Sequence, residues 1–299
     1  MKNMQIKKIY LFKIYSIIFL MLLQFITISQ ALANMNNMLE EVVYFDINAQ
    51  DVNYKLEMTI FRDGNLYNMP LIIMNHGVPS DKSELSKMIR ARPITQAKLF
   101  VEKGYAVAVP MRRGYAQSEG KPPAFSCDIT ATANEESLDI IAAVKYMNTL
   151  PYIKKDSTTL IGVSAGALAS FAAASQLRET VISVINFSGG RRLRGGQSDS
   201  CYPLELLNAF SYFGEKVTVP TLWLYSPNDK VFPPELVKQN VNKFQTAGGT
   251  LDYRDIPVFN GDAHNIFSNP HAIPLWWAQV QNFMGDKSVK LQKINTQLN

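Results

Sequence analysis

The segment Gly162-Val163-Ser164-Ala165-Gly166 joins a run typical of a buried strand, residues 159–163, to a small-residue run typical of a helix, residues 165–177. A sharp strand-to-helix turn needs glycine where a side chain would clash with neighbouring backbone. Such a turn leaves the Ser164 hydroxyl exposed, and a base nearby could make it a nucleophile. The alternative is an ordinary glycine-containing turn with a buried serine. The segment therefore predicts a strand followed directly by a helix.

The rest of the chain alternates between the same two patterns. Short β-branched or aromatic runs predict strands at residues 42–47, 54–61, 71–75, 105–110, 159–163, 181–187, 219–225 and 251–257. Helices are expected at residues 94–103, 135–150, 165–177, 235–247 and 274–284. This alternation favours an α/β fold with a mostly parallel sheet covered by helices on both faces. The first strands look antiparallel and predict extra strands at one edge.

Composition and continuity predict a single globular domain over residues 34–299. Hydrophobic residues make up 47% of the chain, which excludes an intrinsically disordered protein. No internal repeat, long linker or change of composition divides this region. Residues 188–213 are irregular in pattern and predict a small cap or a long crossover.

Residues 1–33 have the layout of a secretory signal peptide. A lysine-containing leader precedes an apolar run, residues 14–28, and Ala31-Leu32-Ala33 provides a cleavage site before Asn34. The apolar run is short for a membrane span of about 20 residues. We therefore expect an exported protein, periplasmic or secreted, with cleavage after Ala33. Membrane attachment is expected only if the segment stays uncleaved.

The charge and the motifs argue against nucleic acid, cofactors and metals. The formal net charge is +5, but four lysines of the leader supply most of it, so no polyanion-binding surface is expected. The Gly-rich motifs of dinucleotide and nucleoside triphosphate sites are missing from the sequence. Its three histidines are scattered, without the spacing of a metal site. We expect no cofactor, no metal and no nucleic-acid partner.

Cys127 and Cys201 are the only cysteines of the chain. Both lie in loop-like segments, and an exported protein meets an oxidising compartment where a disulfide persists. A bridge between the two loops is the first expectation, and two unrelated thiols are the alternative.

Asp229 and His264, which both follow Ser164 in the chain, complete a candidate Ser-Asp-His triad. Asp229 ends an apolar strand, and His264 lies in a loop after the last strand. The order Ser, Asp, His is the one found in α/β-hydrolases. His76 precedes Ser164, which makes it a poorer candidate for the base. The alternatives are a helix-capping role for Asp229 and a surface position for His264.

An oxyanion formed at Ser164 would need two backbone N–H donors. Ala165 directly follows the serine and supplies one. Val78 lies in the loop after an early strand and is the expected second donor. We expect His76 to orient this loop, although a plain β-turn is the alternative.

Five segments together resemble the α/β-hydrolase superfamily: HGVP at 76–79, RRGYAQSEG at 112–120, GVSAG at 162–166, SPND at 226–229 and GDAH at 261–264. The stretch from NFSGGRR to GDAHNIF is similar to the dienelactone-hydrolase-like branch. The resemblance spans about residues 40 to 285. It implies an α/β-hydrolase fold and a hydrolytic activity, in a branch that includes esterases and peptidase-like enzymes.

One departure from that branch concerns the nucleophile. The founding dienelactone hydrolases use cysteine, whereas this chain has Ser164. The difference favours ordinary ester hydrolysis over dienelactone turnover. Arg191 and Arg192 are candidates for binding a substrate carboxylate, because bidentate arginine contacts suit that role. A solvated loop is the alternative for both.

We therefore expect an exported, carboxylesterase-like serine hydrolase that acts on a small-molecule ester through an acyl-enzyme. A peptidase or acyl-peptide hydrolase with the same triad is the alternative. It would need paired glutamates for a charged amino terminus, and Glu205 is the only glutamate in the cap-like region. A transferase and a non-catalytic binding module on a hydrolase scaffold also remain open.

Overall fold

The computed structural model describes residues 37–49, 51–79, 84, 87–123, 126–192 and 202–285. The chain divides into two units, Met1–Met38 and Leu39–Asn299, and the second carries the sheet described below. The predicted signal peptide lies outside the described residues, so its cleavage stays a prediction. Within the described part of the chain, no helix has both the length and the apolar character needed to cross a membrane.

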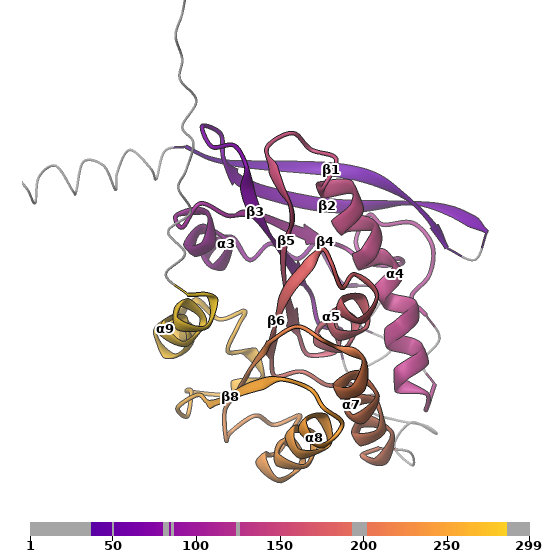
Figure 1. Cartoon of the computed structure of the whole chain (residues 1–299), viewed down its shortest axis with the longest axis vertical. Coiled ribbons are helices and arrows are strands. Elements are labelled where there is room, and N and C mark those ends of the chain that lie inside the picture. Colours follow the sequence, from indigo (N-terminus) through magenta and orange to yellow (C-terminus); the bar gives the residue numbers. More distant parts are fainter. Residues whose placement is uncertain are drawn as a thin grey trace, which may run out of the picture. The chain divides into compact units, whose positions relative to one another are not determined.

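Eight strands of the described chain form one sheet in the order β1-β2-β4-β3-β5-β6-β7-β8 (Figure 1). The bounds are β1 Met38–Ala49, β2 Val52–Asp63, β3 Met69–Asn75, β4 Ala106–Pro110, β5 Ile153–Val163, β6 Val181–Phe187, β7 Thr221–Tyr225 and β8 Leu251–Asp255. Strand β2 pairs with β4 antiparallel, and every pair from β4 to β8 is parallel. The predicted α/β fold, with additional strands at one edge, is confirmed.

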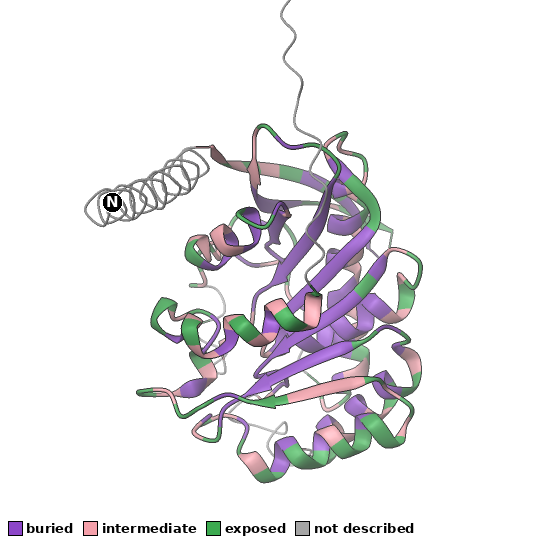
Figure 2. Cartoon of the chain, turned by 60° about the vertical axis from the view of Figure 1, so that its left-hand side comes forward, coloured by how far each residue is buried: buried purple, intermediate pink, exposed green. Residues whose placement is uncertain are grey.

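Helices cover both faces of this sheet, as expected for parallel strands that bury both of their sides. Helices α4 (Ile129–Met147), α5 (Ala165–Gln176), α7 (Leu204–Lys216) and α8 (Pro234–Thr246) lie on one side, and α3 (Ile94–Val101) and α9 (Ile273–Met284) on the other (Figure 1). Every residue of β3, β4 and β7 is buried. Figure 2 shows these central strands buried along their length, whereas the helices have a buried and an exposed side.

The segment 188–213, predicted to be an irregular cap or long crossover, lies between β6 and β7 and is helical from Leu204 onward, where α7 begins. Leu206, Ala209, Phe210 and Phe213 are buried on one side of α7, and the helix packs against α4, α5 and α8. Their spacing of three and four is typical of a helix. The prediction missed it because the glycines and arginines earlier in the segment made the whole segment look irregular. The residues from Leu204 onward therefore form a covering helix of the sheet. Helix α4 also begins earlier than predicted, at Ile129, because the Asp128 side chain accepts from the Ala131 N–H.

The ring of Phe210 packs on Trp223 of β7 and on Phe171 of α5, with ring centroids 4.8 and 6.2 Å apart. We expect Phe210→Ala to lower the free energy of unfolding by about 3–5 kcal/mol, because it leaves a cavity in this cluster. Urea denaturation of both proteins measures the difference. Leu204→Ala, an exposed position on the same helix, is the matched control and should change it by less than about 0.5 kcal/mol. Equal effects of the two changes would contradict the packing of α7.

Candidate active site

Ser164 lies in a tight turn between β5 and α5, with φ of 52° and ψ of −123°. A non-glycine residue with positive φ costs on the order of 1–3 kcal/mol and persists only where its surroundings hold it. Here the Ser164 N–H donates to the carbonyl of Phe187 at 3.0 Å, and its carbonyl accepts from Ala167 at 3.0 Å and Gly190 at 3.2 Å. The backbone on both sides of the serine is therefore fixed.

The glycines of this turn are required by close backbone contacts. A Cβ at position 162 would lie 2.3 Å from the Cα of Ala167, and one at position 166 would lie 2.3 Å from the Asn75 carbonyl oxygen. A Cβ at Gly77 would lie 3.1 Å from the Cβ of Ser164. The loop after β3 and the start of α5 thus meet at the serine, as the predicted strand-to-helix turn requires.

Asp229 and His264 are in direct contact, although 35 residues separate them in the chain. The Nδ1 atom of His264 lies 3.2 and 3.1 Å from the two carboxylate oxygens of Asp229. A carboxylate can only accept, so the proton of the imidazole lies on Nδ1, and Nε2 is left as the basic nitrogen. The carboxylate itself is buried and also accepts the N–H groups of Val231 and Phe232, at 2.8 and 3.0 Å.

The loops that carry Asp229 and His264 are tied together by two further side chains. Asn228 donates to the carbonyl of Phe259 at 2.6 Å, and its own oxygen accepts the Phe259 N–H at 3.2 Å. Asp262 accepts the N–H groups of His264 and Lys230, at 3.0 and 3.1 Å. Burial, the largest single influence, raises the pKa of Asp262, but these two N–H groups together with the electrostatic effect of His264 and Lys230 bring the pKa below its ordinary value. The contact between His264 and Asp229 is therefore held from both loops.

The loop after β3 is held by His76. Its Nδ1 lies 2.7 Å from the carbonyl of Gly77, and its Nε2 accepts the N–H of Arg112 at 3.2 Å. Burial, followed by the charge of Arg112, brings the pKa of His76 well below 6.5. A neutral ring with its proton on Nδ1 satisfies both contacts. His76 thus has both ring nitrogens engaged with backbone.

Two backbone N–H groups beside Ser164 are the predicted oxyanion donors. Ala165 is the first residue of α5, so its N–H has no acceptor within the helix. Among the described residues, the N–H of Val78 also has no hydrogen-bond acceptor. The start of α5 adds a favourable dipole for a negative charge.

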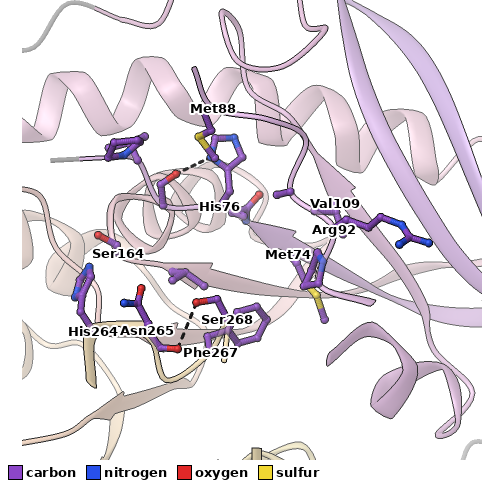
Figure 3. A pocket seen from close by; sticks show the side chains of 17 residues that line it. Met74, His76, Met88, Arg92, Val109, Ser164, His264, Asn265, Phe267 and Ser268 are labelled. Carbon is purple, nitrogen blue, oxygen red and sulfur yellow. Dashed lines mark hydrogen bonds between the residues drawn. The ribbon is translucent and has the colours of Figure 1, made fainter. Parts of the chain in front are cut away.

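Ser164, His264 and Val78 line one cavity of about 450 Å³. This volume falls in the range of about 300–1,000 Å³ that is usual for small-molecule sites. Figure 3 shows Ser164 and His264 at one end of the cavity, with Phe267 and Ser268 along one side. The structure thus brings together the serine, the histidine and the loop that the sequence predicted, with Asp229 behind the histidine.

Comparison with known proteins assigns the chain to a family. The model of the dienelactone hydrolase family matches residues 91–286, which is well over half of the chain. The chain belongs to the dienelactone hydrolase family. The predicted α/β-hydrolase fold and the predicted family are both confirmed, and the family is one of hydrolases. Comparison with curated proteins gave no match.

Solved structures of low sequence identity share the fold of this dienelactone hydrolase family member. The esterase Pf2001 of Pyrococcus furiosus has a TM-score of 0.55 and 19% identity, covering 82% of this chain and 91% of the esterase. Est1E of Butyrivibrio proteoclasticus, solved with ferulic acid, has a TM-score of 0.57 and 19% identity, covering 81% of this chain and 97% of Est1E. The acylaminoacyl peptidase of Pyrococcus horikoshii has a TM-score of 0.58 and 15% identity, covering 87% of this chain and 43% of the peptidase.

The two arginines predicted to bind substrate do not line the cavity beside Ser164 in this family member. Arg191 is buried and forms an ion pair with Glu136 of α4. The guanidinium of Arg192 lies 4.9 Å from the ring centre of Tyr202. These contacts favour a structural role for both side chains, and binding of a substrate carboxylate stays a prediction. The predicted bridge from Cys127 to Cys201 also stays a prediction, because Cys201 lies outside the described residues.

The segment RRGYAQSEG at 112–120 is anchored by contacts that its sequence pattern did not predict. Arg113 donates from its backbone N–H and its Nε to the two carboxylate oxygens of Asp139, at 2.8 and 2.7 Å. Burial raises the pKa of Asp139 to about 6, and the Arg113 charge opposes that rise. Tyr115 packs edge-on against His76, with ring centroids 5.1 Å apart. The segment at 112–120 thus supports the loop after β3.

The burial of His76 makes stability depend on pH. The folded protein favours the neutral ring, whereas the unfolded chain takes up a proton near pH 6.5. Stability from this residue is therefore complete above pH 6.5 and lost as the pH falls below it, by at most about 1.4 kcal/mol per pH unit. We expect the free energy of unfolding, measured by urea denaturation at pH 7.5 and 5.5, to differ less between the two pH values for His76→Gln than for the unchanged protein. His271→Gln, at an exposed position, should retain the full difference. An equally large difference in His76→Gln would contradict a buried, neutral His76.

Proposed function

We propose that the protein is an exported serine esterase that hydrolyses carboxylic esters through an acyl-enzyme. The observation that carries the proposal is the contact between His264 Nδ1 and the Asp229 carboxylate, with His264 and Ser164 lining one cavity. The family is hydrolytic, and structures that share the fold include esterases. The signal-peptide layout of residues 1–33 supports the export.

The proposed reaction begins when Ser164 Oγ attacks the ester carbonyl carbon and passes its proton to His264 Nε2. The carbonyl oxygen becomes an oxyanion that accepts hydrogen bonds from the N–H groups of Val78 and Ala165. Asp229 holds the imidazole in the required tautomer and stabilises the imidazolium. The intermediate collapses, the C–O bond to the alcohol breaks, and His264 returns the proton to the departing alkoxide.

Water completes the cycle in the proposed mechanism. His264 takes a proton from a water molecule, which attacks the acyl carbon and forms a second tetrahedral intermediate. Its collapse breaks the bond to Ser164 Oγ, which regains a proton from His264, and the free acid leaves. No cofactor or metal enters these steps.

The test uses the protein from Asn34 onward, 4-nitrophenyl acetate and a fluorophosphonate probe. We expect ester turnover and labelling of Ser164, with both lost in Ser164→Ala. Retained turnover in Ser164→Ala would contradict the proposal. Labelling of Ser164 without turnover of any ester would favour the peptidase or the transferase over the esterase. Neither labelling nor turnover would favour a non-catalytic binding module.

A further inference from the structure

The cavity beside Ser164 is apolar at the side away from the serine. Met74 at the end of β3, Val109 of β4 and Phe267 all line it and are buried. Figure 3 shows Met74 and Val109 at the end of the cavity opposite Ser164 and His264. A group that enters this space from the carbonyl bound at Ser164 therefore meets hydrocarbon and thioether surfaces.

Arg92 is the only lysine or arginine among the described residues that line the cavity. Its guanidinium is already engaged, because Nε and one terminal nitrogen donate to the two carboxylate oxygens of Glu40. The hydrogen bonds from Arg92 hold the pKa of Glu40 below its ordinary value, so the carboxylate stays ionised. Figure 3 shows the Arg92 side chain extending away from Ser164 and His264. The positive charge at this wall is therefore neutralised within the protein.

We propose that this cavity is an acyl subsite for uncharged, apolar acyl groups longer than acetyl, and that Glu40 excludes anionic acyl groups by occupying Arg92. The inference rests on the proposed function and names the substrate class of the same site. An acyl group with a terminal carboxylate would have to displace Glu40 or leave its charge unpaired beside Met74 and Val109. Displacing Glu40 breaks its bidentate contact with Arg92. A carboxylate beside the buried Met74 and Val109 would have no partner for its charge.

Acyl length is the first variable to test. For 4-nitrophenyl acetate, butyrate and hexanoate we expect kcat/KM to rise by about fourfold for each added CH₂, as expected for transfer of a methylene from water to an apolar wall. Val109→Phe fills the cavity from β4, and Met88→Trp fills it from a half-buried wall. We expect each to lower the ratio of hexanoate to acetate turnover by at least about tenfold.

Charge is the second variable, tested with two acyl groups of equal length. The unchanged protein should prefer 4-nitrophenyl hexanoate to the 4-nitrophenyl half-ester of adipic acid. Glu40→Gln frees Arg92 for the adipate carboxylate and should raise the adipate-to-hexanoate ratio of kcat/KM about tenfold, the value of one charge-assisted hydrogen bond. The double variant Glu40→Gln with Arg92→Gln is the matched control and should lose this gain.

The results separate the acyl subsite from the proposed chemistry. The activity of Ser164→Ala tests the proposed serine mechanism and not the acyl subsite. Fluorophosphonate labelling of each cavity variant shows that its site is folded. A flat or falling chain-length profile in an active, labelled protein would overturn the subsite, as would filled variants that keep the original ratio. An adipate preference in the unchanged protein, or no change in Glu40→Gln, would overturn the role of Glu40.

Discussion

Asp229→Asn should lower kcat for ester hydrolysis by about 10⁴-fold and leave KM within a few fold. The carboxylate oxygens of Asp229 face the Nδ1 atom of His264 at 3.2 and 3.1 Å. An amide nitrogen there would donate to Nδ1, which moves the imidazole proton to Nε2. The histidine could then no longer accept the proton of Ser164. The remaining amide oxygen can still accept from Val231 and Phe232, so the loop should keep its shape.

Asp262→Asn is the matched control for this prediction. It is the same chemical change in a neighbouring loop, and an amide oxygen can still accept from the N–H groups of His264 and Lys230. We expect kcat to fall by less than about tenfold. Steady-state kinetics with 4-nitrophenyl acetate measure both variants. An Asp229→Asn protein that keeps more than about a tenth of the activity would show that another group orients His264.

The parts of the site that local sequence patterns specify were predictable. The glycines at 162 and 166 are required by contacts with Ala167 and Asn75, and any sharp strand-to-helix turn imposes a similar requirement. A mostly parallel sheet follows from the alternation of strands and helices, and parallel strands bring their carboxyl ends to one edge of the sheet. Asp229 and His264 could therefore be selected from their places after strands, before any distance was known.

The contacts that depend on two distant segments were not predictable. Asn228 and Phe259, or Arg191 and Glu136, meet only once the sheet and α4 are assembled. Neither pair has a spacing in the sequence that a helix or a hairpin would bring together. The arginines near residue 191 therefore looked like a substrate-binding cluster, whereas Arg191 is paired in the interior. The bidentate contact of Glu40 with Arg92 was missed for the same reason.

His76→Gln should lower kcat by about 10²-fold, the value of one oxyanion donor, and leave the shape of the pH–rate profile unchanged. His76 holds the Gly77 carbonyl through Nδ1, and this carbonyl belongs to the peptide unit whose N–H is that of Val78. A longer, more flexible amide holds that peptide less well and weakens its hydrogen bond to the oxyanion. His76 is neutral over the working range because burial and Arg112 lower its pKa. Its loss should therefore remove no titrating group from the profile.

His264→Gln is the comparison variant for this prediction. Loss of the proposed base should remove the acidic limb of kcat/KM against pH together with most of the activity. If His76→Gln removed that limb and His264→Gln kept it, the base would be His76 and the triad would be wrong. If His76→Gln left kcat unchanged, the loop after β3 would hold Val78 without it. The hydrogen bond of Asn75 to Ser170, 2.7 Å long, would then be the contact that fixes this loop against α5.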